Sequence, residues 1–239
     1  MICGIILAAG RGSRLGSITQ NSHKSLIKFD KTNLMENILQ NYKKNQIEKV
    51  CFVTGYNHNL FKKYKIKKFF NKYWKNTNMV YSLMMADSWL SKYTCIVTYS
   101  DIYYNSKAIK LLKNSKNNFV ILNNKNWLSN WKSRYKNPLM DAESFKTDKK
   151  KFLIEIGKKE KSVKNINGQY MGLMKITPHT WKKIKLKLPE VKKKNKVSIT
   201  ELLNKLIIFN FKIKTVTYKH KWFEIDNKKD LSFFLNNFK

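Results

Sequence analysis

The fold is decided near the start of the chain, by the run Cys3-Gly-Ile-Ile-Leu-Ala-Ala-Gly-Arg-Gly-Ser-Arg-Leu15. Its apolar part, residues 3–8, is typical of a buried strand, and it leads directly into a loop that holds two glycines and two arginines. Gly10 and Gly12 allow the backbone to turn tightly and to bring its N–H groups close to phosphate oxygens. The run therefore predicts a strand followed by a phosphate-binding loop.

Two cations in and after this loop suit a triphosphate. Arg14 can bridge phosphate oxygens with its fork of donors, and Lys24 adds a mobile point charge. A Gly-x-Gly after a strand is by itself common in loops without a phosphate ligand, but here it is combined with these cations. No Gly-Lys-Ser/Thr closes the loop and a third glycine is missing, so the Walker A and Rossmann patterns are both absent. ATPases and dehydrogenases are therefore poor interpretations.

The rest of the chain alternates apolar runs with amphipathic stretches, which is the pattern of strand and helix units that feed a parallel sheet. The runs expected to be strands lie at 50–54, 78–82, 95–99, 119–122, 152–156, 168–176 and 211–218. The stretches expected to be helices lie at 33–45, 106–114, 198–208 and 226–238. Ser198 and Glu201 have the spacing of a capping box. No repeat or flexible linker divides the chain, so residues 1–239 predict a single α/β domain.

The formal charge of +34 at pH 7 is extreme and raises the question of a nucleic-acid or membrane partner. Almost all basic residues are scattered lysines, however, and only Arg11, Arg14 and Arg134 are arginines. A nucleic-acid interface more often clusters arginine, because its planar fork fits phosphates and base edges. We therefore expect no nucleic-acid partner, and a positive field that attracts a small polyanionic substrate.

Cysteine usage and hydropathy favour a cytoplasmic protein. Cys3, Cys51 and Cys95 lie far apart, in or beside apolar runs and without the spacing of metal ligands, so we expect buried free thiols in a reducing compartment. The first residues lack the basic segment of a signal peptide, and no apolar stretch reaches the roughly 18 residues that a membrane helix needs. We accordingly expect no membrane partner.

Two carboxylates are candidate ligands of a metal ion. Asp101 ends the apolar run 95–99, at the carboxyl end of a predicted strand, where open α/β sheets bind their ligands. Asp226 alternates with Glu224 near the end of the chain and so shares one strand face with it. Mg²⁺ prefers one or two carboxylates together with phosphate oxygens, which Asp101 and Asp226 can supply. The alternative roles are a turn-forming residue for Asp101 and a helix N-cap for Asp226.

These motifs resemble the sugar-phosphate nucleotidylyltransferases, and in particular their phosphocholine cytidylyltransferase branch. The resemblance is carried by Leu7-Ala-Ala-Gly-Arg-Gly-Ser-Arg-Leu15 with Thr19 and Lys24, by Asp101, and by Trp222-Phe-Glu-Ile-Asp-Asn-Lys-Lys-Asp-Leu231. It implies a Rossmann-like three-layer fold of the nucleotide-diphospho-sugar transferase (GT-A-like) type, with a mostly parallel central sheet and helices on both faces. It also implies Arg14 and Lys24 as catalytic residues, and Mg²⁺ as a cofactor held by Asp101 and Asp226. The family usually has proline before the lysine, where this chain has His23.

The resemblance further implies CTP as the nucleotide. The residues expected to bind it lie in the glycine loop and in the segment 77–83, which resembles the one that follows the base-contacting region of the family. They are Leu7, Ala8, Ala9, Gly10, Gly12, Ser13, Thr77, Asn78 and Ser82. Met79 and Tyr81 can equally be core residues.

The second substrate is expected to carry a cationic amine, because aromatic rings lie beside carboxylates in the middle of the chain. Segments 137–145, 155–159 and 168–173 are similar to a bacterial subgroup of these cytidylyltransferases, of which some act on phosphoramidate precursors of capsule modification. The acceptor is then phosphocholine, an aminoalkylphosphonate or an amino-acid phosphoramidate. Its expected binding residues are Tyr81, Trp127, Trp131, Asp141, Glu143, Lys158 and Gln169. Lys158 would reach the acceptor phosphate; the alternative is that the tryptophans only pack and the carboxylates lie on the surface.

The expected reaction is attack of an acceptor phosphate oxygen on the α-phosphorus of CTP with release of pyrophosphate, for modification of a cell-surface polysaccharide. An ionised phosphate needs no general base, so catalysis would come from orientation and charge stabilisation. One alternative keeps the fold but makes an NDP-sugar from a sugar 1-phosphate. The other is a non-catalytic basic protein that binds nucleic acid and holds Asp101 and Asp226 far apart. The acceptor and the oligomeric state stay open, and a homodimer is one expectation.

Overall fold

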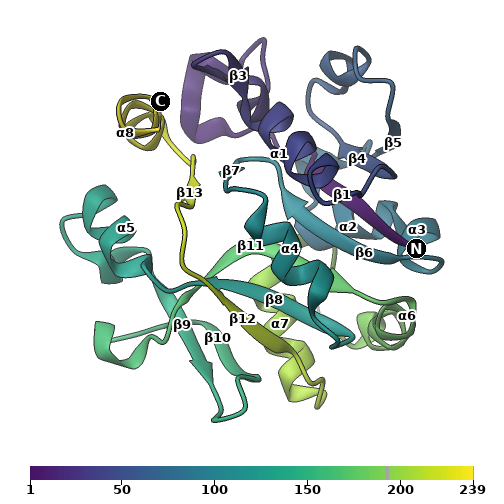
Figure 1. Ribbon diagram of the computed structural model, residues 1–239, viewed down its shortest axis with the longest axis vertical. Helices are drawn as coiled ribbons and strands as arrows, with labels where there is room; N and C mark the ends of the chain where they lie inside the picture. Colours follow the sequence, from purple (N-terminus) through teal and green to yellow (C-terminus); the bar gives the residue numbers. More distant parts are fainter. Residues whose placement is uncertain (192–193, 239) are drawn as a thin grey trace.

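A mixed sheet of seven strands runs through the centre of the molecule, in the order β12-β8-β11-β6-β1-β4-β5 (Figure 1). The computed structural model describes residues 1–191 and 194–238. The strands of this sheet are β1 (Ile2–Ala8), β4 (Val50–Thr54), β5 (Lys67–Phe70), β6 (Thr94–Tyr99), β8 (Phe119–Asn124), β11 (Gln169–Ile176) and β12 (Lys214–Tyr218). Strand β11 is antiparallel to both of its neighbours, and the other pairs are parallel. The expected mostly parallel sheet is therefore confirmed.

Three short two-stranded sheets lie outside the seven-stranded sheet. They are β2 (Lys28–Phe29) with β3 (Thr32–Asn33), β7 (Ile102–Tyr103) with β13 (Phe223–Glu224), and β9 (Glu143–Thr147) with β10 (Leu153–Lys159). The β9–β10 hairpin and α5 lie together beyond the β8 and β12 side of the sheet (Figure 1). This arrangement leaves the carboxyl ends of β1 and β6 facing the middle of the molecule, where β13 approaches them.

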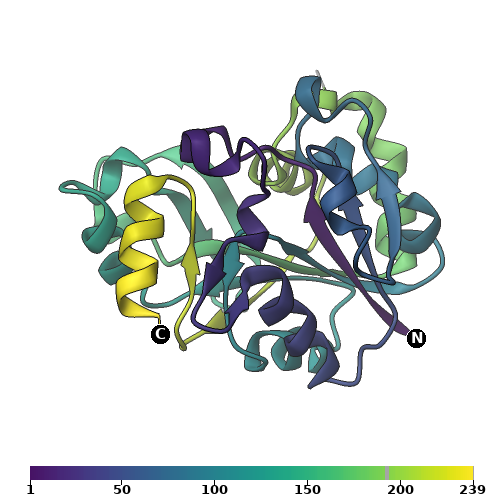
Figure 2. The same cartoon turned by 90° about the horizontal axis from the view of Figure 1, so that it is seen from above.

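Helices cover both faces of the sheet. They are α1 (Leu34–Lys43), α2 (Met79–Met85), α3 (Asp87–Leu90), α4 (Lys107–Asn114), α5 (Trp127–Arg134), α6 (Pro178–Lys187), α7 (Ile199–Ile208) and α8 (Lys228–Asn237). Helices α1 and α4 lie on one face, and α2 and α7 lie on the other (Figure 2). Shorter 3-10 segments include η1 (Ser13–Thr19), η2 (Lys24–Leu26), η3 (His58–Phe61), η4 (Trp74–Asn76), η5 (Pro138–Met140), η6 (Val163–Asn165), η7 (Leu188–Glu190) and η8 (Lys194–Lys196). The layered α/β architecture expected from the sequence is confirmed.

The central strands are buried along most of their length, as expected for parallel strands with helices on both sides. All three cysteines lie in this core as free thiols, as predicted. The capping box of α7 is present, because Ser198 Oγ accepts from the Glu201 N–H at 3.1 Å and the Glu201 carboxylate accepts from the Ser198 N–H at 2.6 Å. Over residues 1–191 and 194–238, no helix is both long enough and apolar enough to cross a bilayer.

One predicted strand is wrong. Residues 78–82 form the start of α2, because the side chain of Asn78 accepts a hydrogen bond from the Met79 N–H at 2.7 Å and caps the helix. The apolar side chains that this helix buries are Val80 and Leu83, three residues apart, together with the polar Ser82. The strand at this side of the sheet is β5, which lies within the preceding Lys-rich segment and forms the edge next to β4.

A second apolar cluster joins the two ends of the described chain. It consists of Leu15, Phe29, Leu34, Phe223, Ile225, Leu231 and Phe234. Through it, α8 packs beside η1 and the β2–β3 ladder, so the yellow helix lies next to the purple segment in Figures 1 and 2. The cluster therefore brings the last residues of the chain to the loop that follows β1.

Candidate active site

Three carboxylates converge at the carboxyl edge of the sheet. Asp101 follows β6, Glu224 lies in β13, and Asp226 comes two residues later. Strand β13 pairs with β7, which directly follows Asp101, and the Ile225 N–H donates to the Asp101 carbonyl at 3.0 Å. This short ladder places one oxygen of each carboxylate within 4.8 Å of the others. The predicted pair of Asp101 and Asp226 is therefore joined by Glu224, which the sequence placed on the face of Asp226 without a role.

Burial and the proximity of the carboxylates to one another make it unfavourable for all three to be ionised at once. Burial raises the pKa of Glu224 well above its usual range, and the charges of Asp226 and Asp101 raise it further. The pKa of Asp226 is also raised, by burial and by Asp101, although nearby cations act in the opposite direction. The cluster is thus arranged to hold additional positive charge.

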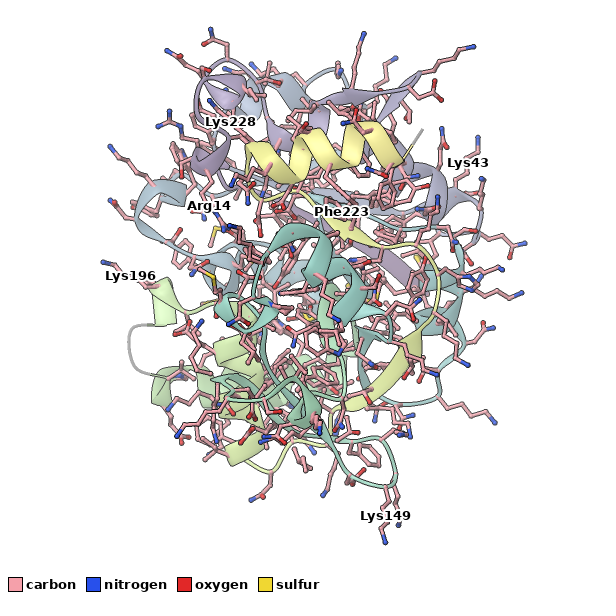
Figure 3. The ribbon with its side chains drawn as sticks, turned by 90° about the vertical axis from the view of Figure 1, so that its left-hand side faces the viewer. Arg14, Lys43, Lys149, Lys196, Phe223 and Lys228 are labelled. Atoms are coloured by element: carbon pink, nitrogen blue, oxygen red, sulfur yellow. The ribbon has the colours of Figure 1, made fainter. Side chains whose placement is uncertain are left out.

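Three cations already face the cluster. Lys24 forms an ion pair with Asp101, and although burial opposes its charge, Asp101 and Asp226 raise the pKa of the lysine. Arg14 Nη2 donates to Asp226 Oδ1 at 2.9 Å, and Arg134 Nη2 lies 3.4 Å from Asp226 Oδ2. In Figure 3, Phe223 of β13 lies directly below α8, and Arg14 lies below and to the left of the same helix. The two predicted catalytic cations and the two predicted metal ligands are therefore neighbours.

The glycine loop is shaped by local contacts. Gly12 has a left-handed conformation with φ of 66°, and a Cβ atom there would lie only 3.1 Å from Lys24 Cδ. Thr19 Oγ1 donates to the carbonyl oxygens of Gly12 and Gly16 at 3.1 and 3.3 Å. His23 is fully buried beneath the loop and caps η2, where its Nδ1 accepts from the Ser25 N–H at 3.2 Å. These contacts set the path of the backbone between Gly10 and Lys24.

A cavity of about 220 Å³ opens beside the loop and the carboxylates. Its lining residues are Leu7, Ala9, Gly10, Arg14, Lys24, Met79, Ser82, Tyr99, Ser100, Asp101, Glu224 and Asp226. The sequence did not single out Met79, Tyr99, Ser100 or Glu224 for this cavity. The position of Tyr99 and Ser100 directly before Asp101 was a signal that could have identified them.

The other residues predicted to bind the nucleotide do not line this cavity, but lie behind its lining residues or beside them. Ala8 is buried in β1, and Gly12 and Ser13 continue the loop beyond the lining. Thr77 accepts a hydrogen bond from Asn71 Nδ2 at 3.0 Å, and Asn78 caps α2. Because Asn71 Nδ2 also donates to Ser82 Oγ at 3.1 Å, this amide links Thr77 to a residue of the lining.

A second cavity of about 190 Å³ adjoins the first. Its lining residues are Arg14, Tyr99, Trp131, Asp141, Glu143, Ser144, Phe145, Ile156, Gln169, Tyr170, Gly172, Glu224 and Asp226. Four of these residues, Arg14, Tyr99, Glu224 and Asp226, also line the first cavity. The two cavities therefore meet at Arg14 and the carboxylates.

Four predicted acceptor residues line this second cavity, namely Trp131, Asp141, Glu143 and Gln169. Trp131 Nε1 donates to Asp141 Oδ2 at 3.0 Å, and the Gln169 amide bonds both backbone groups of Glu143. Burial, reinforced by Asp141, raises the pKa of Glu143. The Tyr170 hydroxyl is buried and has no hydrogen-bond partner in the described part of the chain. This wall thus combines an aromatic face with two acidic side chains.

Three predicted acceptor residues lie elsewhere. Tyr81 packs edge-on against Tyr73, and Trp127 is buried one turn before Trp131, with its ring edge-on to that residue. Lys158 is exposed and pairs with Glu155 at 2.8 Å. The β9–β10 ladder shifts register between Ile156 and Lys159, so the strand alternation that would have turned Lys158 inward is interrupted.

Two alternatives drawn from the sequence can be compared with this structure, the N-cap role of Asp226 and the non-catalytic protein. The N-cap of α8 is Asn227, whose side chain accepts from the Lys229 and Asp230 N–H groups at 2.9 and 3.0 Å. Asp226 therefore does not cap the helix. A wide separation of Asp101 and Asp226 would have supported the non-catalytic alternative, and the two carboxylates instead lie in one cluster.

The residues present fit a hard divalent cation. Carboxylate oxygens are the donors that Mg²⁺ prefers, and three of them come from three separate side chains here. A cation at this position would also relieve the mutual repulsion that raises the pKa of Glu224 and Asp226. The donor set and its charge therefore suit Mg²⁺.

Comparisons with known proteins agree with the fold. A MobA-like NTP transferase domain matches residues 4–138. The chain is 33% identical over 183 residues, 72% of each chain, to a protein of Campylobacter jejuni subsp. jejuni serotype O:2 named CTP:phosphoglutamine cytidylyltransferase. It is also 32% identical to a choline-phosphate cytidylyltransferase of Haemophilus influenzae. The matched 125 residues cover 51% of this chain and 53% of that protein.

Solved structures share the fold. The CTP:phosphocholine cytidylyltransferase of Streptococcus pneumoniae matches with a TM-score of 0.75 at 17% identity, covering 100% of this chain and 99% of that chain. The inositol-1-phosphate CTP transferase of T. maritima matches with a TM-score of 0.78 at 19% identity, covering 98% and 93%. The resemblance inferred from the sequence is confirmed, and the chain belongs to the MobA-like NTP transferase family of nucleotidyltransferases.

Proposed function

We propose that this chain is a Mg²⁺-dependent cytidylyltransferase, which transfers CMP from CTP to a small phosphorylated acceptor that carries a cationic amine. The observation that carries the proposal is the meeting of two cavities at Arg14, Glu224 and Asp226, beside Asp101, which completes the carboxylate cluster. A nucleotide in the first cavity and an acceptor in the second would present their phosphates to each other at this junction. The names of the C. jejuni and H. influenzae relatives support CTP as the nucleotide.

The reaction needs one bond to form and one to break. An acceptor phosphate oxygen attacks the α-phosphorus of CTP, and the bond from this phosphorus to the bridging oxygen breaks, so pyrophosphate leaves with the electron pair. Gly10 and the loop after β1 would bind the polyphosphate through backbone N–H groups, and Lys24 would neutralise part of its charge. Arg14 lines both cavities and would contact the phosphates of both substrates.

Asp101, Asp226 and Glu224 would hold the metal ion. Bound there, Mg²⁺ would polarise the α-phosphoryl group and offset the negative charge that develops on it. The acceptor phosphate is already ionised at neutral pH, so no side chain has to remove a proton. The residues of the chain therefore act by binding, orienting and neutralising.

The second cavity suits an acceptor with charge at both ends. Arg14 faces the phosphate end, while Asp141 and Glu143 beside the Trp131 ring would receive an ammonium group. We propose an amino-acid phosphoramidate of the phosphoglutamine type, as in the name of the C. jejuni relative, with phosphocholine and aminoalkylphosphonates as competing acceptors. The use of the product in a cell-surface polysaccharide is part of the same proposal and rests on the resemblance alone.

A pyrophosphate-release screen tests the reaction. CTP, UTP, GTP, ATP and dTTP would each be combined with phosphoglutamine, phosphocholine, 2-aminoethylphosphonate and glucose 1-phosphate. We expect release with CTP and an amine-bearing acceptor only, and none after Mg²⁺ is chelated. Glu190→Gln, which alters an exposed ion pair with Lys187, is the control for losses of activity during preparation of a variant. Release with glucose 1-phosphate and not with the amines would reject the acceptor class, and release without a metal would reject the cofactor.

A further inference from the structure

Arg134 is a buried arginine that the proposed reaction does not use. It is the last residue of α5, and its side chain is only 2% exposed. Its Nε and Nη2 atoms bond the two oxygens of Asp230 at 2.8 and 2.9 Å, and Nη2 also lies 3.4 Å from Asp226 Oδ2. One guanidinium therefore contacts two carboxylates of the same segment.

Aromatic rings also surround the guanidinium. Its central carbon lies 5.4 Å from the centre of the Trp131 ring and 5.7 Å from that of Phe223. Burial alone would lower the pKa of Arg134, but the hydrogen bonds and charge of Asp230 raise it above its ordinary value. The side chain is thus a fixed cation with little freedom to move.

Asp230 connects Arg134 to the backbone of Asp226, the proposed metal ligand. Its Oδ2 accepts from the N–H groups of Asp226 and Asn227 at 3.1 and 3.2 Å. Arg134 therefore reaches Asp226 twice, directly through the carboxylate and indirectly through the backbone. Arg14 differs, because its side chain is 65% exposed and it contacts the other oxygen of Asp226 from the open side. Arg14 is free to move to a phosphate, whereas Arg134 stays in place.

The same helix forms part of the acceptor cavity. Trp131, three residues before Arg134, lines that cavity and donates to Asp141. Its ring also stacks on Trp222, which precedes β13, at 5.9 Å and an angle of 11°. Helix α5 is therefore attached both to the acceptor wall and to the strand that carries Glu224.

We propose that Arg134 is a positioning residue that fixes the orientation of the Asp226 carboxylate and thereby sets the affinity of the carboxylate cluster for a divalent cation. This inference rests on the proposed function, because it takes Asp226 as a metal ligand. Partners that orient a metal ligand typically change metal affinity or activity by about 10- to 100-fold when they are mutated. The contacts of Arg134 are of this kind.

The test is the affinity for Mn²⁺ alone, followed through the EPR signal of the free ion. Arg134→Lys keeps a positive charge but cannot bond both oxygens of Asp230 and reach Asp226. Arg134→Gln combined with Asp230→Asn removes the ion pair without leaving a buried carboxylate unpaired, and Asn at 230 still offers an oxygen to the backbone. We expect the Kd for Mn²⁺ to rise about 10-fold or more in both variants. Lys146→Gln is the matched control, because Lys146 also bridges two carboxylates, Glu155 and Glu160, but none of these three residues lines either cavity.

Thermal unfolding of the same samples separates positioning from a purely structural role. A wild-type Kd in folded variants, whatever their Tm, would overturn the proposal, because Arg134 would then only attach α5 to α8. The proposal is supported if both variants retain a cooperative unfolding transition and both show a raised Kd for Mn²⁺. Asp226→Asn is measured beside them: if it binds Mn²⁺ as the wild type does, Asp226 is not a ligand, and both this inference and the proposed metal site fail. If Asp226→Asn loses Mn²⁺ while the Arg134 variants keep it, only the inference on Arg134 fails.

Discussion

Arg14 and Asp226 are 212 positions apart in the sequence, yet a hydrogen bond of 2.9 Å joins them where the two cavities meet. The aspartate is mostly buried and the arginine is mostly exposed, so only the arginine can leave this pair without disturbing the core. In the proposed reaction, the arriving phosphates would draw Arg14 away from Asp226 and free one oxygen of that carboxylate.

Replacement of Arg14 should therefore affect catalysis and not folding. We expect Arg14→Gln to lower kcat/KM for CTP by about 100-fold, as for the loss of a group that stabilises transition-state charge. The Tm should stay within the error of the wild type, because the side chain is largely in solvent. Arg11→Gln is the control: Arg11 lies on the same loop, and its guanidinium is placed over the Tyr56 ring at 5.6 Å. Equal losses of kcat/KM in Arg14→Gln and Arg11→Gln would contradict a specific role of Arg14 and would indicate a general effect of the positive charge of the loop.

The third carboxylate should show opposite effects on stability and on activity. Burial and like charge disfavour the ionised form of Glu224, which is why its pKa is raised. Glu224→Gln removes that repulsion, so we expect the Tm at pH 7 to rise by a few degrees, which corresponds to about 1 kcal/mol. Pyrophosphate release should fall, because a ligand of the proposed metal site is lost. A lower Tm together with normal turnover would show that Glu224 is a structural residue.

His23 should make the stability of the protein depend on pH. Burial, followed by the charge of Lys24, lowers the pKa of His23 to about 4, so the unfolded chain takes up a proton at a higher pH than the folded one. The full stability is therefore present above about pH 6.5 and decreases by up to about 1.4 kcal/mol per pH unit as the pH falls toward 4. Urea unfolding of the wild type and of His23→Asn at pH 7 and pH 5 measures the difference. His179→Asn, at an exposed site, should keep the slope of the wild type.

The acidic wall of the second cavity should determine the KM of the acceptor. We expect Glu143→Gln to raise this KM by about 10-fold, since a hydrogen bond to a charged group contributes about 1.5 kcal/mol, and to leave the KM for CTP unchanged. Lys158→Ala is the matched comparison, because its side chain pairs with Glu155 and does not line the cavity. A rise in both KM values would mean that Glu143 maintains the shape of the site and does not select the acceptor.

The parts of this site that are local in sequence could be predicted from it. The loop after β1 and the position of Asp101 both follow from an apolar run that ends in particular residues. The role of Glu224 could not be predicted, because it depends on the pairing of β13 with β7, which joins segments more than a hundred residues apart. Helix α2 was missed because five residues are too few to separate the two periodicities, and only the cap at Asn78 distinguishes them. The position of Lys158 outside the second cavity could not be predicted, because no sequence pattern indicates the shift of register in the β9–β10 ladder.

The packing of α8 against η1 and the β2–β3 ladder has a consequence for synthesis. A ribosome produces Lys24 and Asp101 long before Asp226, and the apolar cluster that holds Asp226 in place includes Leu231 and Phe234, which come later still. A nascent chain that already has its sheet therefore lacks a complete set of carboxylates. A chain that stops anywhere before α8 would lack the residues that hold Asp226 in place, and we expect it to show no turnover in the proposed reaction.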